Sequence, residues 1–239
     1  MNSLFTNNIS LDHGTHTYQL LDDPEFRFAS VTEFIHEFFR KFDQEKVAKK
    51  LISEHPKYID RTLDDVIKEW RKGAERGTIV HNELELFIKK GIEPKNELAS
   101  IGARWLRKKQ ENPDNTFYSE VIVYSKELGV AGTIDVLVYN KKQNTYHLVD
   151  WKTNKRINQK PFGNKKGILN ATQHLDDCNF IHYSLQLSFY RYILENCYGL
   201  KVGSQTLFHL RADNYKTYTV NYHDHEDDLV NMLKEKELL

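Results

Sequence analysis

The chain has 239 residues, enough for one well-buried core, and no shift in composition marks a second domain. Its 34 basic and 34 acidic residues cancel, so the overall charge lacks the basic excess common among nucleic-acid-binding proteins. Two cysteines exclude a four-thiolate zinc or iron–sulfur centre, and without a long apolar segment we expect a soluble, intracellular protein, either cytoplasmic or viral in a host cell.

The N-terminal part is predicted to be mainly helical after an irregular or hairpin start. Ser30 has capping-box spacing to a glutamate and opens an aromatic-rich helix predicted over 34–42. Thr62 is a weaker start signal for a further helix. A helix from about Ala74 to Lys90 follows, with apolar residues recurring every three or four positions, so one side of it is packed.

From residue 116 the apolar period changes to two. Segments 117–124, 130–139 and 145–151 are rich in β-branched and aromatic residues and are separated by short polar turns, which predicts consecutive antiparallel strands. A polar loop, a helix from about Cys178 to Cys197, strands at 206–211 and 215–222 and an acidic C-terminal helix follow. The expected fold class is α/β.

Two acids lie in the middle of this strand-rich region. Asp135 follows Gly-Thr-Ile, and Asp150 is followed by Trp151 and Lys152. Acids in strand interiors are disfavoured, so both should have a partner. Because side chains alternate along a strand, Asp150 and Lys152 share a face, and the hairpin can place Asp135 opposite them.

Paired carboxylates suit Mg²⁺ or Mn²⁺, which prefer oxygen ligands. Such an ion lowers the pKa of a bound water and neutralises charge on a phosphoryl oxygen, while Lys152 can orient the nucleophile. This chemistry fits phosphodiester hydrolysis. A buried Asp–Lys ion pair beside a hairpin is the alternative interpretation of the same residues.

The order Gly-Thr-Ile-Asp, polar turn, Leu-Val-Asp150-Trp-Lys152-Thr resembles the signature of the PD-(D/E)XK nuclease superfamily. The resemblance implies a restriction-endonuclease-like core: a mixed β-sheet with an antiparallel catalytic hairpin, flanked by helices, plus an N-terminal helical region. We expect a single nuclease domain over 1–239, in which 1–110 is the mainly helical part and 116–222 holds the catalytic sheet and helix.

Further segments resemble the RecB-like exonuclease branch, although the cysteines that clamp an iron–sulfur cluster in many relatives are missing. That resemblance implies a metal ligand at His81, a strand glutamate at Glu120 and active-site residues at Gln186 and Tyr190. The expected ligands are His81, Asp135, Asp150 and the Trp151 carbonyl, with Glu120 assisting.

Two expectations come from spacing and charge. Glu85 lies four residues after His81 on the same helical face, where it could accept from the imidazole and fix its tautomer. The segment 151–175 contains no acid, and Lys155, Arg156 and Lys160 in it could contact a phosphate backbone, unless the segment is an ordinary solvated face.

The predicted activity is metal-dependent hydrolysis of DNA by an exonuclease that prefers single strands or free duplex ends. An RNA-cleaving endonuclease with similar site chemistry and an inactive DNA-binding accessory remain alternatives. Expected partners are DNA and proteins of replication, repair or recombination, with no membrane association.

Overall fold

The computed structural model describes residues 4, 8–12, 14–15 and 17–239. Its strands are β1 (Ile9–Asp12), β2 (Thr17–Leu20), β3 (Ala29–Ser30), β4 (Asn115–Ser125), β5 (Val130–Asn140), β6 (Thr145–Lys152), β7 (Val202–Leu210) and β8 (Tyr215–Val220). Its α-helices are α1 (Val31–His36), α2 (Gln44–Glu54), α3 (Leu63–Lys90), α4 (Glu97–Gln110), α5 (Asn179–Asn196) and α6 (Glu226–Glu235), and short 3-10 turns cover η1 (Pro56–Tyr58), η2 (Phe162–Asn164), η3 (Asn170–Thr172) and η4 (Tyr222–Asp224).

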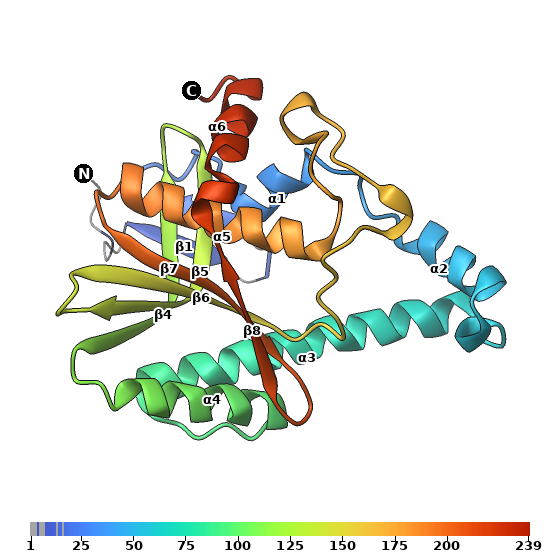
Figure 1. Cartoon of the computed structure of the whole chain (residues 1–239), viewed down its shortest axis with the longest axis horizontal. Coiled ribbons are helices and arrows are strands. Elements are labelled where there is room, and N and C mark those ends of the chain that lie inside the picture. Colours follow the sequence, from blue (N-terminus) through green and yellow to red (C-terminus); the bar gives the residue numbers. More distant parts are fainter. Residues whose placement is uncertain (1–3, 5–7, 13, 16) are drawn as a thin grey trace.

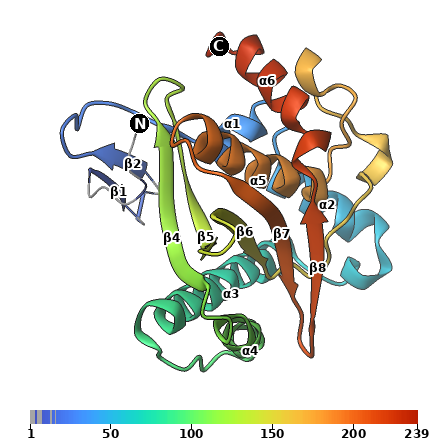
Figure 2. The same ribbon diagram turned by 60° about the vertical axis from the view of Figure 1, so that its left-hand side comes forward.

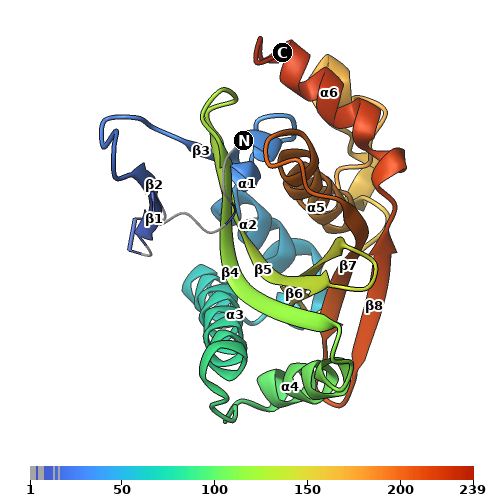
Figure 3. The same cartoon turned by 90° about the vertical axis from the view of Figure 1, so that its left-hand side faces the viewer.

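A six-stranded mixed sheet forms the middle layer (Figure 1). β4, β5 and β6 are antiparallel, β6 pairs in parallel with β7, and β8 is antiparallel to β7. Helices α1, α5 and α6 lie on one face of the sheet, and α3 and α4 lie on the other (Figure 3). The α/β fold with an antiparallel β5–β6 hairpin is thereby confirmed.

Each face of the sheet has its own apolar core. The core under α5 includes Phe34, Phe189 and Leu148, and the core under α3 and α4 includes Leu84, Leu106 and Trp151. Alternation along β6 accounts for this division, because Leu148 points into the first core while its neighbour Val149 points into the second. Both faces of the sheet are therefore covered.

A separate two-stranded hairpin, β1–β2, lies beside β4 (Figure 2). Tyr18 and Leu20 on β2 pack against Tyr124 and Ala131, which anchors this hairpin to the main sheet. The hydroxyl of Tyr18 is 3.0 Å from that of Thr133, two residues before Asp135. The N-terminal hairpin thus touches the β5 segment that carries the predicted site.

Several predicted boundaries were wrong. The helix predicted over 34–42 ends at His36, because the chain turns to bury Phe38 and Phe39. The helix start predicted at Thr62 is confirmed, since Thr62 caps α3 at Leu63, but the separate start predicted at Ala74 is wrong because α3 runs on without a break to Lys90.

The helix predicted between the two cysteines is confirmed, since Cys178 and Cys197 are the caps of α5 and both thiols are free. Within the part of the chain that the structure describes, no helix has the length and apolar character needed to cross a bilayer.

Candidate active site

The candidate site lies where β5 and β6 part. β6 pairs with β5 only over Val136–Asn140, and β3 pairs with Val130 and Ala131 on the same edge. Both must lie on this edge because β4 occupies the other edge of β5 along its whole length. Among the described residues, none pairs as a strand with Gly132–Asp135 on this edge, so side chains can enter the gap.

Asp135 and Asp150 flank this point on the two strands. Backbone pairing between β5 and β6 ends at Val136 and Val149. Beyond that pair, the backbone N–H of Trp151 donates to Oδ2 of the Asp135 side chain at 2.7 Å. Asp150 is 3% exposed, and its Oδ2 lies 2.6 Å from Nζ of Lys152. The two carboxylates and the ammonium thus meet on β5 and β6, as the alternation pattern predicts.

His81 reaches the same point from α3 on the other side of the gap. Its Nδ1 lies 3.5 Å from Oδ1 of Asp135, and its Nε2 lies 3.2 Å from the carbonyl oxygen of Trp151. Gly77, one turn earlier, allows this approach, since a Cβ there would meet Oγ1 of Thr153 at 3.1 Å. The missing side chain lets α3 lie against the chain leaving β6.

Glu120 on β4 enters the site through an unusual backbone conformation. Its φ is +52°, a left-handed value that is uncommon outside glycine, and the ladder pair it would form with Asp135 is absent between the pairs on either side. The alternation of faces also changes phase here: Tyr118 packs against the α5-side core, and so does Val121, three residues later. The local kink re-aims the Glu120 carboxylate, as β-bulges do.

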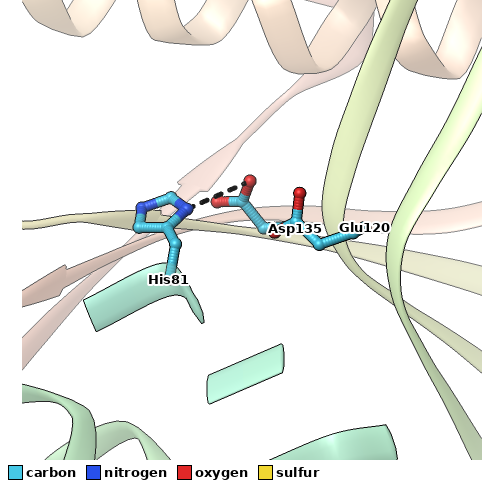
Figure 4. Close-up of side chains that lie close together, drawn as sticks. All are labelled: His81, Glu120 and Asp135. Carbon is cyan, nitrogen blue, oxygen red and sulfur yellow. Dashed lines mark ion pairs between the residues drawn. The ribbon is translucent and has the colours of Figure 1, made fainter. Parts of the chain in front are cut away.

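His81, Glu120 and Asp135 form a compact set of potential ligands (Figure 4). Each offers one ligand atom, and these atoms lie within 4.8 Å of one another. Asp150 lies outside this set, turned toward Lys152. The three ligands come from α3, β4 and β5, so they converge only in the folded chain.

Burial and mutual charge perturb the site's titratable groups. Burial, followed by the charge of Asp135, raises the pKa of Glu120 to about 8. Burial alone would lower the pKa of His81, but the Asp135 carboxylate outweighs it and raises that pKa to about 9. Burial raises the pKa of Asp150 to about 6, although Lys152 opposes the shift. The charge of His81 overcomes burial and keeps the pKa of Asp135 below its usual value.

This donor set fits a divalent cation. One imidazole and two carboxylates, with the Trp151 carbonyl and Asp150 beside them, are nitrogen and oxygen donors of the kind that Mn²⁺ and Mg²⁺ accept. Burial and, after it, the charge of Asp135 raise the pKa of Glu120 and so disfavour its ionised form, and a bound cation would offset both effects.

Lys152 is held from the α5 side. Its Nζ donates to Oε1 of Gln186 at 3.5 Å and lies 4.2 Å from the ring centroid of Tyr183. Nε2 of Gln186 donates to the Tyr190 hydroxyl at 2.9 Å. A Cβ on Gly132 would stand 2.4 Å from Cε1 of Tyr190, so only glycine fits beneath that ring.

Other predicted site residues have different neighbours. Glu85 binds Lys89 at 2.6 Å, while both imidazole nitrogens of His81 face Asp135 and Trp151 instead. Lys155 pairs with Glu69 on α3. Arg156 and Lys160 are exposed on the loop that follows β6.

Some interactions near the centre were not predicted. Nε2 of His209 lies 2.6 Å from the carbonyl of Asn154, and the hydroxyl of Tyr183 donates to the Asn154 side chain at 3.0 Å. Another is the Tyr18–Thr133 hydrogen bond from β2. Tyr183 lies one turn before Gln186 in the same predicted helix, so the sequence indicates that it is near the site. Asn154, His209 and Tyr18 lie on segments whose placement the local sequence does not indicate.

Comparison with known proteins gives one match to a family model. The model of the PD-(D/E)XK nuclease superfamily matches residues 15–237. No curated protein matches the chain. Among solved structures, one titled "Crystal structure of SSO0001" is 15% identical and aligns over 86% of this chain and 76% of that chain, with a TM-score of 0.37. That overlap is too loose to inform function, and the family rests on the sequence match.

Proposed function

The chain belongs to the PD-(D/E)XK nuclease superfamily, and we propose that it is a metal-dependent deoxyribonuclease that acts at the centre around Asp135 and Lys152. The observation that carries this proposal is the convergence of His81, Glu120 and Asp135 on one point beside a buried Asp150–Lys152 pair. A structural ion pair alone would not need an imidazole and a strained glutamate at the same place.

We propose that His81, Glu120 and Asp135 hold one Mg²⁺ or Mn²⁺, with Asp150 and the Trp151 carbonyl adjacent. When bound, such an ion supplies charge stabilisation at the scissile phosphate and an acidified water. Lys152, buried between Asp150 and the Tyr183 ring, keeps its proton because the pKa rise caused by Asp150 and Asp135 outweighs burial. It therefore acts as a fixed cation that orients the attacking water and stabilises charge on the phosphoryl oxygens.

Gln186 positions Lys152 rather than contacting the reacting atoms. Its amide links the lysine to the buried Tyr190 hydroxyl and so restrains the ammonium. Tyr190 is 3% exposed. In this proposal Tyr190 therefore fixes the position of Gln186. Residues outside the buried centre contact the nucleic acid directly.

We further propose that residues 1–239 act as one nuclease domain, because α3, β4, β5 and β6 all supply the centre. An exonuclease of the RecB-like kind is the favoured assignment, with Lys155, Arg156 and Lys160 on the loop after β6 guiding the phosphate backbone toward Lys152. The resemblance of the His81 and Gln186 helical segments to that branch supports it.

The test is digestion of end-labelled DNA, single-stranded and duplex, with matched RNA, in Mg²⁺, Mn²⁺ or EDTA. Asp150→Ala and Lys152→Ala should each abolish cleavage while circular dichroism shows an intact fold. Asp213→Asn, an exposed carboxylate in the β7–β8 turn, is the matched control and should cleave normally. Near-normal activity of either site variant with Mn²⁺ would refute the mechanism, and faster cleavage of RNA than of DNA would refute the substrate assignment.

A further inference from the structure

A helical arm extends from the domain beside the candidate site. It consists of α2, η1 and the first half of α3, residues 63–77, and it projects past the sheet at the right of Figure 1. Within α3, all of which the structure describes, Val66 is buried near the α2 end and the next buried residue is Val80. The helix between them is therefore held by neither core.

The loop that follows Lys152 lies on this arm. Two residues of α3 contact the loop. The guanidinium of Arg76 donates to the Thr153 carbonyl at 3.5 Å, and Glu69 pairs with Lys155. Farther along the loop, Nζ of Lys50 on α2 lies 5.7 Å from the ring centroid of Phe162. These interactions join the loop and both helices into one surface that starts at the active centre.

This surface is strongly basic in a chain of zero net charge. Residues 40–76 contain 11 basic and eight acidic residues, and residues 151–175 contain six basic and no acidic residues. The two segments together therefore carry +9, and the remainder of the chain carries −9. Such separation gives a positive face that attracts a polyanion although the total charge does not.

The same surface exposes two phenylalanine rings. Phe42, before α2, is 62% exposed and Phe162 is 77% exposed. Two open hollows lie next to them. Phe42, Lys46 and Lys49 line one hollow together with the acidic residues Asp43 and Glu45, and Arg40, Lys165 and Lys166 line the other together with neutral residues. Exposed aromatic rings set among basic side chains can stack on unpaired bases while the charges follow the phosphates.

We propose that the arm and loop form a platform for a single strand of the DNA substrate, with bases stacked on Phe42 and Phe162 and phosphates beside Arg40, Lys50 and Lys165. This inference rests on the proposed function, because it takes the strand to be the one that enters the centre at Lys152. A duplex would not use the rings, since its bases are already stacked on each other. The platform thus predicts preference for unpaired substrate.

The first experiment measures binding, in EDTA so that no strand is cut. A fluorescein-labelled 20-nucleotide oligothymidine and a 20-base-pair duplex are titrated with wild type and with Phe42→Ala/Phe162→Ala. The double variant should bind the oligothymidine at least about tenfold more weakly, with a much smaller change for the duplex. Leu21→Ala removes an apolar side chain that is also 62% exposed, outside both basic segments, and should bind as wild type does.

Because Phe42 lies 5.7 Å from the Trp70 ring, its replacement could disturb the arm, so Phe162 is also tested alone. Phe162→Ala should lose affinity, and Phe162→Trp should restore it. Lys50→Gln/Lys165→Gln should reduce the salt dependence of oligothymidine binding by about 0.7 in log–log slope for each phosphate that the protein no longer neutralises. Unchanged single-strand affinity in the aromatic variants, or an equal loss for the duplex, would overturn the platform.

The two proposals can fail separately. If wild type cleaves DNA with Mn²⁺ but the aromatic variants bind and cleave normally, the platform is wrong and the nuclease stands. If wild type binds single strands through Phe42 and Phe162 yet gives no metal-dependent product, the platform stands and the proposed function is wrong.

Discussion

Gly132→Ala is the sharpest test of how the fold supports the site. The added methyl would stand 2.4 Å from Cε1 of Tyr190, whereas ordinary contacts begin near 3.4 Å, so ring and strand must separate by about 1 Å. The ring is 3% exposed and part of the α5-side core, so it has no free space to enter. Overpacking of this kind costs about 1–3 kcal/mol.

Urea unfolding followed by tryptophan fluorescence measures that cost, and thermal melting should show a fall of about 2–4 °C per kcal/mol for a chain of this size. Gly73→Ala is the matched control. A Cβ at Gly73 meets no atom of the described residues within 4 Å, so this change inside α3 should stabilise the chain by about 0.5–1 kcal/mol.

Activity should fall further than the loss of stability explains, because a displaced Tyr190 moves Gln186 and with it Lys152. Gly132→Ala/Tyr190→Leu removes the clashing ring atom and should recover part of the stability lost in Gly132→Ala, but not the activity. A Gly132→Ala protein as stable as wild type would show that the ring is not fixed where the structure has it.

Three other predictions follow from the site and its surroundings. Glu120→Gly should be more stable than Glu120→Ala by about 1 kcal/mol in urea unfolding, since both lose the carboxylate but only glycine adopts a φ of +52° without strain; equal stabilities would contradict the left-handed backbone. Metal should bind more tightly as the pH rises from about 7 to 9, because the raised pKa values of Glu120 and His81 mean that both hold protons which must leave before the metal binds. Titration calorimetry at pH 7 in two buffers of different ionisation enthalpy should record proton release on metal binding. Metal binding without proton release would contradict the ligand assignment. Asp228→Ala should destabilise the chain by about 1–3 kcal/mol in urea unfolding, since this buried carboxylate lies 2.8 Å from His174 and 3.1 Å from His225. A loss well below 1 kcal/mol would mean that these contacts between α6 and the loop that carries His174 do not stabilise the fold.

The sequence indicates the β5–β6 hairpin well because its information is local. Alternation with period two places Asp150 and Lys152 on one face and sets the strand boundaries within a residue or two. The local sequence does not indicate where β5 and β6 separate. That point depends on β3, which pairs with the other end of the same edge of β5.

The predictions that failed concern backbone conformations and side-chain orientations that depend on tertiary contacts. Gly73 lowers helix propensity, and the predicted helix begins directly after it, yet α3 runs through both Gly73 and Gly77. At Gly77 the missing side chain leaves room for Thr153, a contact that the local sequence does not show. The left-handed conformation of Glu120 leaves no trace in a segment that otherwise has strand character. Spacing alone suggested Glu85 as the partner of His81, but spacing does not fix which way a ring turns.

Helix α3 joins the proposed strand platform to the proposed metal site. From Trp70, beside the Phe42 ring, to His81 is 11 residues on one continuous helix, a distance of about 16 Å. A helix transmits axial and rotational displacement along its length, and a turn by one residue amounts to about 100° around its axis. If a bound strand displaces the arm end of α3, His81 shifts with the helix, so in the proposed mechanism the coordination of the ion depends on how the strand is held.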